Sequence, residues 1–158
     1  MTRHAFALLI VALLGCNKES SEKQAAPAFP LPKLGLSIAL TGKTAIVDEP
    51  YGNGYEIRNP VFGAGGALHV AVLQNPPPPD GQKEDREGAG FKNVVLTRAP
   101  DGWTMTGERP DATMGATFFI VSYRDVGGTH TECRSTGILT AAAHEAAVAA
   151  CTSLSATR

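Results

Sequence analysis

"YRDVGGTHTEC", residues 123–133, places two adjacent glycines between two strand-like runs. Gly127 and Gly128 can both adopt the positive φ angles of a tight hairpin turn. The stretch therefore predicts an antiparallel hairpin centred on these glycines. This centre also sets the cross-strand pairs, which are Asp125 with His130, Tyr123 with Glu132, and Ser122 with Cys133.

After this hairpin the pattern of the sequence changes from strand to helix. Residues 140–154, "TAAAHEAAVAACTSL", are rich in alanine, which has the highest helix propensity. Thr140 is a typical N-cap residue, so we expect the helix to begin there. One side of this helix carries a narrow apolar stripe, made of Ala147, Val148, Cys151 and Leu154.

Before the hairpin, most apolar residues alternate with polar ones, which is the period of a strand. The predicted strands lie in the runs "LGLSIAL" (34–40), "TAIVD" (44–48), "GYEIRNP" (54–60), "ALHVAVL" (67–73), "FKNVVLTR" (91–98), "WTMTGE" (103–108) and "ATFFIVSYR" (116–124). Residues 75–90 interrupt the series with four consecutive prolines and a charged tract. We expect a long loop there, with one charged helical turn.

The N-terminus has the pattern of an export signal. Arg3 and His4 precede an apolar run at residues 5–14, which is shorter than the roughly 20 residues that a membrane-spanning helix requires. "LLGC" at 13–16 then resembles the lipobox of bacterial lipoproteins. The alternative is a buried helix that contains a cysteine.

This resemblance implies cleavage after Gly15 and a diacylglyceryl group on the thiol of Cys16, followed by acylation of the new amine. Several acyl chains anchor a protein stably, so the protein would be held on a bacterial cell-envelope membrane, facing the periplasm or the exterior. Asn17 in place of aspartate resembles the enterobacterial default that favours the outer membrane. The choice between inner and outer membrane stays open.

Composition divides the chain into three parts, namely a signal peptide at 1–15, a flexible tether at 16–33 and one globular domain at 34–158. The tether is charged and rich in Ser, Ala and Pro, so it buries too little apolar surface to offset its ordering entropy. Residues 16–158 hold 13 Lys and Arg against 15 Asp and Glu, a net charge of about −2. Because a basic stripe is missing, we expect no nucleic-acid partner.

The two remaining cysteines fall on the second hairpin strand and on the helix. In an exported chain, Cys133 and Cys151 are expected to pair and so to join the helix to the sheet. On chain-entropy grounds such a bond is worth about 3 kcal/mol. The alternative is two free buried thiols.

Zinc-type residues occur near the C-terminus, but their spacing argues against a metal site. His130 and Cys133 differ by an odd number, which puts them on opposite faces of a strand. His144 and Cys151 are separated by about 10 Å along a helix axis, too far to share one ion. We therefore expect no metal and no cofactor.

Two short motifs resemble nucleotide-binding loops, and neither matches its full pattern. "TGKT" at 41–44 ends like a phosphate-binding loop, but Ser37 stands where that motif needs a glycine. "GAGG" at 63–66 comes before a predicted strand, so the dinucleotide fingerprint does not apply. An exposed turn residue is the simpler interpretation of Lys43.

An antiparallel sheet with a C-terminal helix packed on it makes a single α+β domain, which resembles the PsbP-like fold. The resemblance covers residues 34–155 and depends on element order, on "DGW" at 101–103 and on "HEAAVAACTSL" at 144–154. It implies a domain that occurs in lipid-anchored exported proteins and works by binding, without catalysis. A compact β-sandwich with a terminal helix is the competing architecture.

Two hypotheses for function remain open. The first is a non-catalytic lipoprotein that presents its domain to an envelope protein or a small ligand, with no catalytic residue. The second is an exported hydrolase or accessory enzyme whose site gathers scattered groups such as His69, Asp125 and His130. A pocket that brings these three together would favour the second. The sequence leaves the partner and the oligomeric state open.

Overall fold

The structure is a computed structural model of the 158-residue chain. It describes residues 26–49, 52–111, 113, 115–136 and 139–157. The expected signal peptide and Cys16 lie outside the described residues. Within the described part of the chain, no helix is long and apolar enough to cross a membrane.

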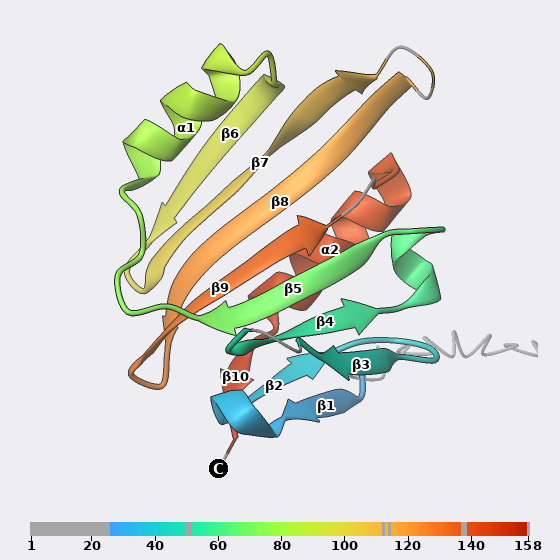
Figure 1. Ribbon diagram of the computed structural model, residues 1–158, viewed down its shortest axis with the longest axis vertical. Coiled ribbons are helices and arrows are strands. Elements are labelled where there is room, and N and C mark those ends of the chain that lie inside the picture. The colour runs from blue at the N-terminus through green and yellow to red at the C-terminus, as the bar shows by residue number, and fades with distance from the viewer. Residues whose placement is uncertain (1–25, 50–51, 112, 114, 137–138, 158) are drawn as a thin grey trace, which may run out of the picture.

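A seven-stranded antiparallel sheet forms the centre of the domain (Figure 1). Its strands, in spatial order, are β3 (Ala45–Asp48), β4 (Gly54–Arg58), β5 (Ala67–Val72), β9 (Thr129–Thr136), β8 (Gly115–Val126), β7 (Gly102–Asp111) and β6 (Lys92–Ala99). Every neighbouring pair in this sheet is antiparallel. The fold is therefore the predicted α+β type, and not a sandwich of two comparable sheets.

The hairpin of β8 and β9 has the predicted register. Asp125 pairs with His130, Tyr123 with Glu132, and Ser122 with Cys133. Gly127 and Gly128 have φ angles of 64° and 85°, as the tight turn requires.

A smaller sheet contains β1 (Ala28–Leu31), β2 (Leu36–Ala39) and β10 (Ser155–Ala156). A short 3-10 helix, η1 (Pro32–Leu34), joins β1 to β2. The domain thus begins about six residues before the expected boundary at residue 34. The Leu31 side chain is fully buried, and β1 is an edge strand, where Pro30 is tolerated.

The C-terminal helix α2 (Ala141–Thr152) begins at the predicted N-cap, because the Thr140 hydroxyl accepts a hydrogen bond from Ala143 N at 3.3 Å. Its buried face contains Ala143, Ala147, Ala150 and Cys151, whereas Val148 of the predicted stripe is only half-buried. The Cys133–Cys151 disulfide joins α2 to β9, with 5.6 Å between the Cα atoms. The predicted pairing is confirmed.

A second helix, α1 (Pro79–Gly88), occupies the region predicted as a loop with one helical turn. Proline at its start and Arg86 in its last turn are both typical of helix ends. No residue of α1 is buried, so the sequence lacks the apolar stripe that predicts a helix. Another 3-10 helix, η2 (Pro60–Phe62), links β4 to β5.

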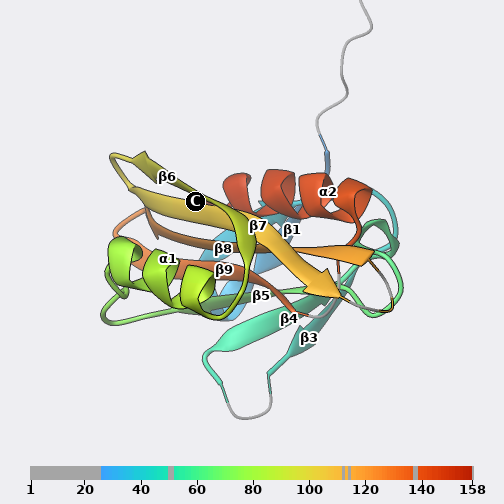
Figure 2. The same cartoon turned by 90° about the horizontal axis from the view of Figure 1, so that it is seen from above.

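The two helices lie on opposite sides of the large sheet (Figure 2). On the α2 side, residues of the small sheet and of α2 pack with Ile57, Val70 and Ile120 in the main core. On the α1 side a smaller core is formed by Trp103, Met105, Phe119, Val121 and Tyr123. Each face of the large sheet therefore contributes to a hydrophobic core. Helix α1 lies on the face opposite α2, and none of its residues is buried.

Candidate functional site

Five polar side chains gather on the sheet face opposite α2, and we call them the polar cluster. They are Glu49, His69, Tyr123, Glu132 and Arg134. Strand register brings them together, because His69 on β5 pairs with Arg134 on β9, and Tyr123 on β8 pairs with Glu132. Residues two apart on a strand share a face, so Glu132 and Arg134 project to the same side.

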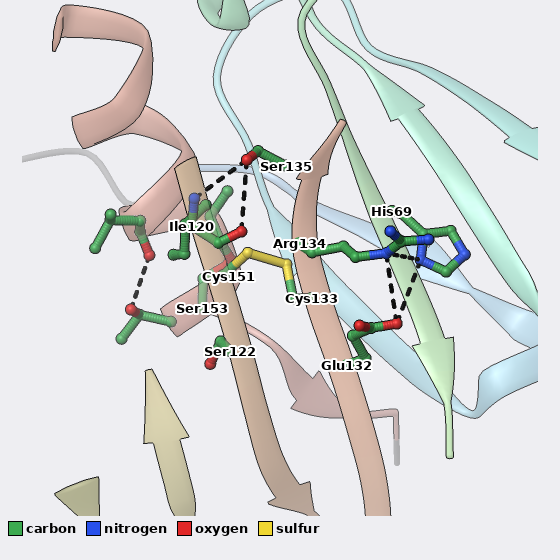
Figure 3. The surroundings of a disulfide bond; sticks show 12 residues. His69, Ile120, Ser122, Glu132, Cys133, Arg134, Ser135, Cys151 and Ser153 are labelled. Carbon is green, nitrogen blue, oxygen red and sulfur yellow. Dashed lines mark hydrogen bonds and ion pairs between the residues drawn. A yellow bond between two sulfur atoms is a disulfide. The ribbon is translucent and has the colours of Figure 1, made fainter. Parts of the chain in front are cut away.

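His69 is the centre of the polar cluster, and its side chain is only 8% exposed. Its Nε2 lies 2.9 Å from Glu49 Oε1, and its Nδ1 lies 3.7 Å from Glu132 Oε2. Arg134 Nε is 3.3 Å from the same Nδ1 (Figure 3). The Tyr123 hydroxyl donates a hydrogen bond of 2.7 Å to the other oxygen of Glu132.

The contacts of His69 Nδ1 belong to two protonation states. In the neutral ring, Nδ1 accepts from Arg134 and the Nε2–H group donates to Glu49. In the protonated ring, both N–H groups face carboxylates. The hydrogen bond with Glu132 raises the pKa of His69, and burial only partly opposes this effect.

The neighbours of His69 have shifted pKa values as well. Burial favours a higher pKa for Glu132, but hydrogen bonds from His69 and Tyr123 outweigh it and lower that pKa. Burial, followed by the hydrogen bond to Glu132, raises the pKa of Tyr123 well above its usual range. Glu132 is thus held as a carboxylate and Tyr123 as a neutral phenol.

The polar cluster links β5, β8, β9 and the residue that follows β3. Both oxygens of Glu132 and both ring nitrogens of His69 have partners inside the cluster. Strand β4 also approaches closely, since a Cβ added at Gly54 would lie 3.0 Å from His69 Nε2. Because these side chains form hydrogen bonds and ion pairs with one another, the polar cluster is a network that joins neighbouring strands.

The second hypothesis required a pocket that gathers three predicted residues. Asp125 and His130 are cross-strand partners and line a pocket of about 280 Å³ with Trp103 and Tyr123. His69 is not part of its lining. Asp125 also accepts a hydrogen bond from Gly128 N at 2.8 Å, which stabilises the hairpin turn. The structure therefore brings together two of the three residues.

The zinc-type residues have other roles. Cys133 and Cys151 are bound to each other, so neither can supply a thiolate to a metal. His144 stacks on Phe118 with a centroid distance of 5.4 Å. Among the described residues, no group of three or more His, Cys, Asp and Glu side chains is placed to hold a metal ion.

A larger pocket, of about 660 Å³, lies at the opposite end of β4 from Gly54. It is lined by Lys43, Ala45, Glu56, Arg58, Asn59, Pro60, Gly63, Gly65, Gly66, Ala67 and Thr136. Parts of both rejected phosphate motifs, "TGKT" and "GAGG", therefore meet in one place. Sequence reasoning judged them separately because they are about twenty residues apart and each lacks its expected partner residues.

No protein-family model matches the sequence, and no curated protein matches it. Its structure is similar to that of CyanoP, the cyanobacterial PsbP of Synechocystis sp. PCC 6803, with a TM-score of 0.54 and 10% identity over 84% of this chain and 92% of that one. A protein of Bacteroides thetaiotaomicron VPI-5482 gives a TM-score of 0.52 and 12% identity over 85% of this chain. This chain spans about half of that protein, 49%. The predicted likeness to PsbP is confirmed for the fold alone.

Proposed function

We propose that this chain is an exported lipoprotein whose domain binds a partner without catalysing a reaction. Cleavage before Cys16 and acylation of that residue would fix it to a cell-envelope membrane, with the outer membrane favoured by Asn17. Residues 17–27 would act as the tether. The partner would be an envelope protein or a small ligand.

The Cys133–Cys151 disulfide is the observation that carries this proposal. Disulfides persist in oxidising compartments and are rare in the cytosol. Both sulfur atoms belong to nearly inaccessible residues, each 1% exposed, and the bond spans two elements of the core. A structural bond of this kind supports export, which the N-terminal pattern predicts independently.

The internal hydrogen bonds and ion pairs of the polar cluster favour binding over catalysis. The polar cluster contains the side chains best suited to acid–base chemistry, yet its members are bonded to one another. The fold likeness to CyanoP supports the same proposal at the level of architecture. Fold alone does not establish function, so the proposal needs a direct test of anchoring and of partner binding.

Metabolic labelling in the native host with an alkyne analogue of palmitate tests the anchor. We expect label on the wild-type chain, no label on Cys16→Ser, and full label on the neighbouring control Asn17→Ser. Label that persists in Cys16→Ser would contradict anchoring at this residue. Crosslinking in intact cells, followed by mass spectrometry, then tests binding. We expect wild type to capture the same partner reproducibly, and the absence of any reproducible partner would contradict a binding role.

A further inference from the structure

The 660 Å³ pocket at the β4–η2 end of the sheet, which we call the glycine pocket, has a floor made by one row of side chains. Ala45, Arg58, Ala67 and Thr136 are successive cross-strand partners on β3, β4, β5 and β9. The residues on both sides of Arg58 in this row are alanines, and the Arg58 side chain is 66% exposed. Arg58 is therefore a basic, solvent-accessible group in the lining of this pocket.

One wall of the glycine pocket is the backbone of residues 63–66. Gly63 and Gly65 have φ angles of 81° and 79°, and an added Cβ at either would meet nothing within 4 Å. Packing thus does not explain these glycines, whereas the left-handed backbone does. Gly66 differs, since an added Cβ there would lie 2.2 Å from Phe62 O. Gly63 N donates to Pro60 O at 3.0 Å and Gly66 N donates to Gly63 O at 3.3 Å. Within this loop, the exposed residues Ala64 and Gly65 are therefore left to offer their N–H groups to a ligand.

The opposite wall is the β2–β3 loop that carries Lys43. Asn59, which is 4% exposed, donates hydrogen bonds of 2.8 Å to Thr41 O and to Thr44 Oγ1. Its Oδ1 accepts from Val61 N at 2.9 Å. One buried side chain therefore fixes the Lys43 loop to the segment that leads into the glycine loop, and the pocket is held in shape before any ligand binds.

We propose that the glycine pocket binds a phosphate group. Peptide N–H groups in turns with positive φ form concavities that accept anions, and Lys and Arg supply the charge-assisted hydrogen bonds that phosphate favours. Lys43 and Arg58 provide two positive charges, and Glu56 offsets one of them through its contact with Arg58 at 2.5 Å. The net local charge is positive in a chain whose total charge is −1.

The position of the pocket indicates the source of the phosphate. Leu40 N donates to Pro27 O at 3.1 Å, so the chain enters the domain beside the loop that carries Lys43. Ten residues separate Ala26 from Cys16, a span of at most about 35 Å. This step rests on the proposed lipid anchor, and it favours a phospholipid headgroup over free phosphate.

Titrations monitored by ¹H–¹⁵N NMR test the site in the full-length chain carrying Cys16→Ser, which cannot be acylated there. One arm uses inorganic phosphate and the other uses glycerophosphoglycerol, a soluble phosphodiester headgroup. Sodium chloride at matched ionic strength is the reference. We expect saturable shifts of the Ala64 and Gly65 amide signals with the phosphodiester, and weaker saturable shifts with inorganic phosphate. No saturable shift in either arm would overturn the proposal.

Three variants sharpen the test. Lys43→Gln should weaken binding about tenfold, the loss expected for one charge-assisted contact. Glu56→Gln should tighten it, because the change releases Arg58 and removes a negative charge. Lys92→Gln is the control, because Lys92 is on β6, at the opposite edge of the sheet from β3. This variant should bind the phosphodiester with wild-type affinity. Equal weakening by Lys43→Gln and Lys92→Gln would show non-specific attraction and overturn the site.

Failure of this proposal and failure of the lipid anchor give different results. Because the titrated chain carries Cys16→Ser, phosphate binding is measured without any acyl group. Labelling with the palmitate analogue is measured on wild type and does not depend on Lys43 or Glu56. A labelled wild type, together with unshifted Ala64 and Gly65 amide signals in the titration, would reject only the phosphate site.

Discussion

His69 on β5 lies directly opposite Arg134 on β9, and the arginine Nε is 3.3 Å from the histidine Nδ1. Glu132 is close to both side chains, at 3.7 Å from His69 Nδ1 and 3.6 Å from Arg134 Nε. Protonation of His69 therefore converts a contact with a cation into one with a carboxylate. The stability of the sheet should depend on pH through this residue.

The raised pKa of His69 sets the sign of that dependence. A group whose pKa is higher in the folded state stabilises fully below its unfolded pKa, here 6.5, and this stabilisation is lost as pH rises through the folded pKa. Urea unfolding near pH 6 and near pH 9 should show a larger loss of unfolding free energy for wild type than for His69→Gln. His130→Gln, which replaces an exposed histidine of the same sheet outside the polar cluster, is the control for removing a histidine. An unchanged slope in His69→Gln would contradict the assignment.

The Cys133–Cys151 disulfide should contribute strongly to stability. Its closed loop spans 18 residues, which corresponds to about 3 kcal/mol on chain-entropy grounds. The double variant Cys133→Ala/Cys151→Ala should lose about that amount in denaturant unfolding. A reductant should reproduce the loss in wild type and leave the double variant unaffected. If the reductant lowers the stability of both proteins equally, the effect does not come from this bond.

Gly54 should be intolerant of any side chain. An added Cβ would lie 2.7 Å from Val70 O and 3.0 Å from His69 Nε2, so Gly54→Ala should destabilise by about 1–3 kcal/mol through overpacking. Gly88→Ala in α1 is the matched control, because nothing lies within 4 Å of the added Cβ. Gly88 is the last residue of α1 and is not among the glycines with positive φ, so the stability of this variant should stay within about 0.5 kcal/mol of wild type. Thermal unfolding of both variants measures the contrast.

Local features of the sequence predicted the C-terminal part of the fold. The register of β8 and β9 follows from two glycines in a turn, and the start of α2 follows from Thr140 and the alanines after it. Each signal depends on residues within a few positions of one another. The disulfide could then be inferred because its two cysteines fall on neighbouring elements.

The polar cluster could not be assembled in the same way. His69 and Arg134 are separated by 65 residues, and their contact depends on β5 pairing with β9 instead of with β6, the next strand in the chain. Alternation of side chains predicts strands and not their neighbours. The hairpin register did place Tyr123 opposite Glu132, so two of the five members of the polar cluster were predicted to be neighbours.

The full length of helix α1 was not predicted, because the helix has no apolar stripe and is held by contacts with distant strands. Arg98 on β6 forms an ion pair with Asp80 at 2.6 Å. The Arg86 guanidinium lies 5.1 Å from the ring centre of Phe119 on β8. Such contacts form between segments that the sequence does not show to be adjacent, whereas a local search for apolar periodicity finds nothing in this tract.

His144 should act on stability in the direction opposite to His69. Burial lowers its pKa, and its Nε2 is buried without a hydrogen-bond partner among the described residues. A base whose folded pKa is depressed stabilises above its unfolded pKa of 6.5 and loses that contribution as pH falls. His144→Leu should therefore change stability little near pH 8 and make the protein more stable than wild type near pH 5. Denaturant midpoints at the two pH values measure this, and a variant that loses stability at pH 5 would show that the imidazole is needed in its charged form.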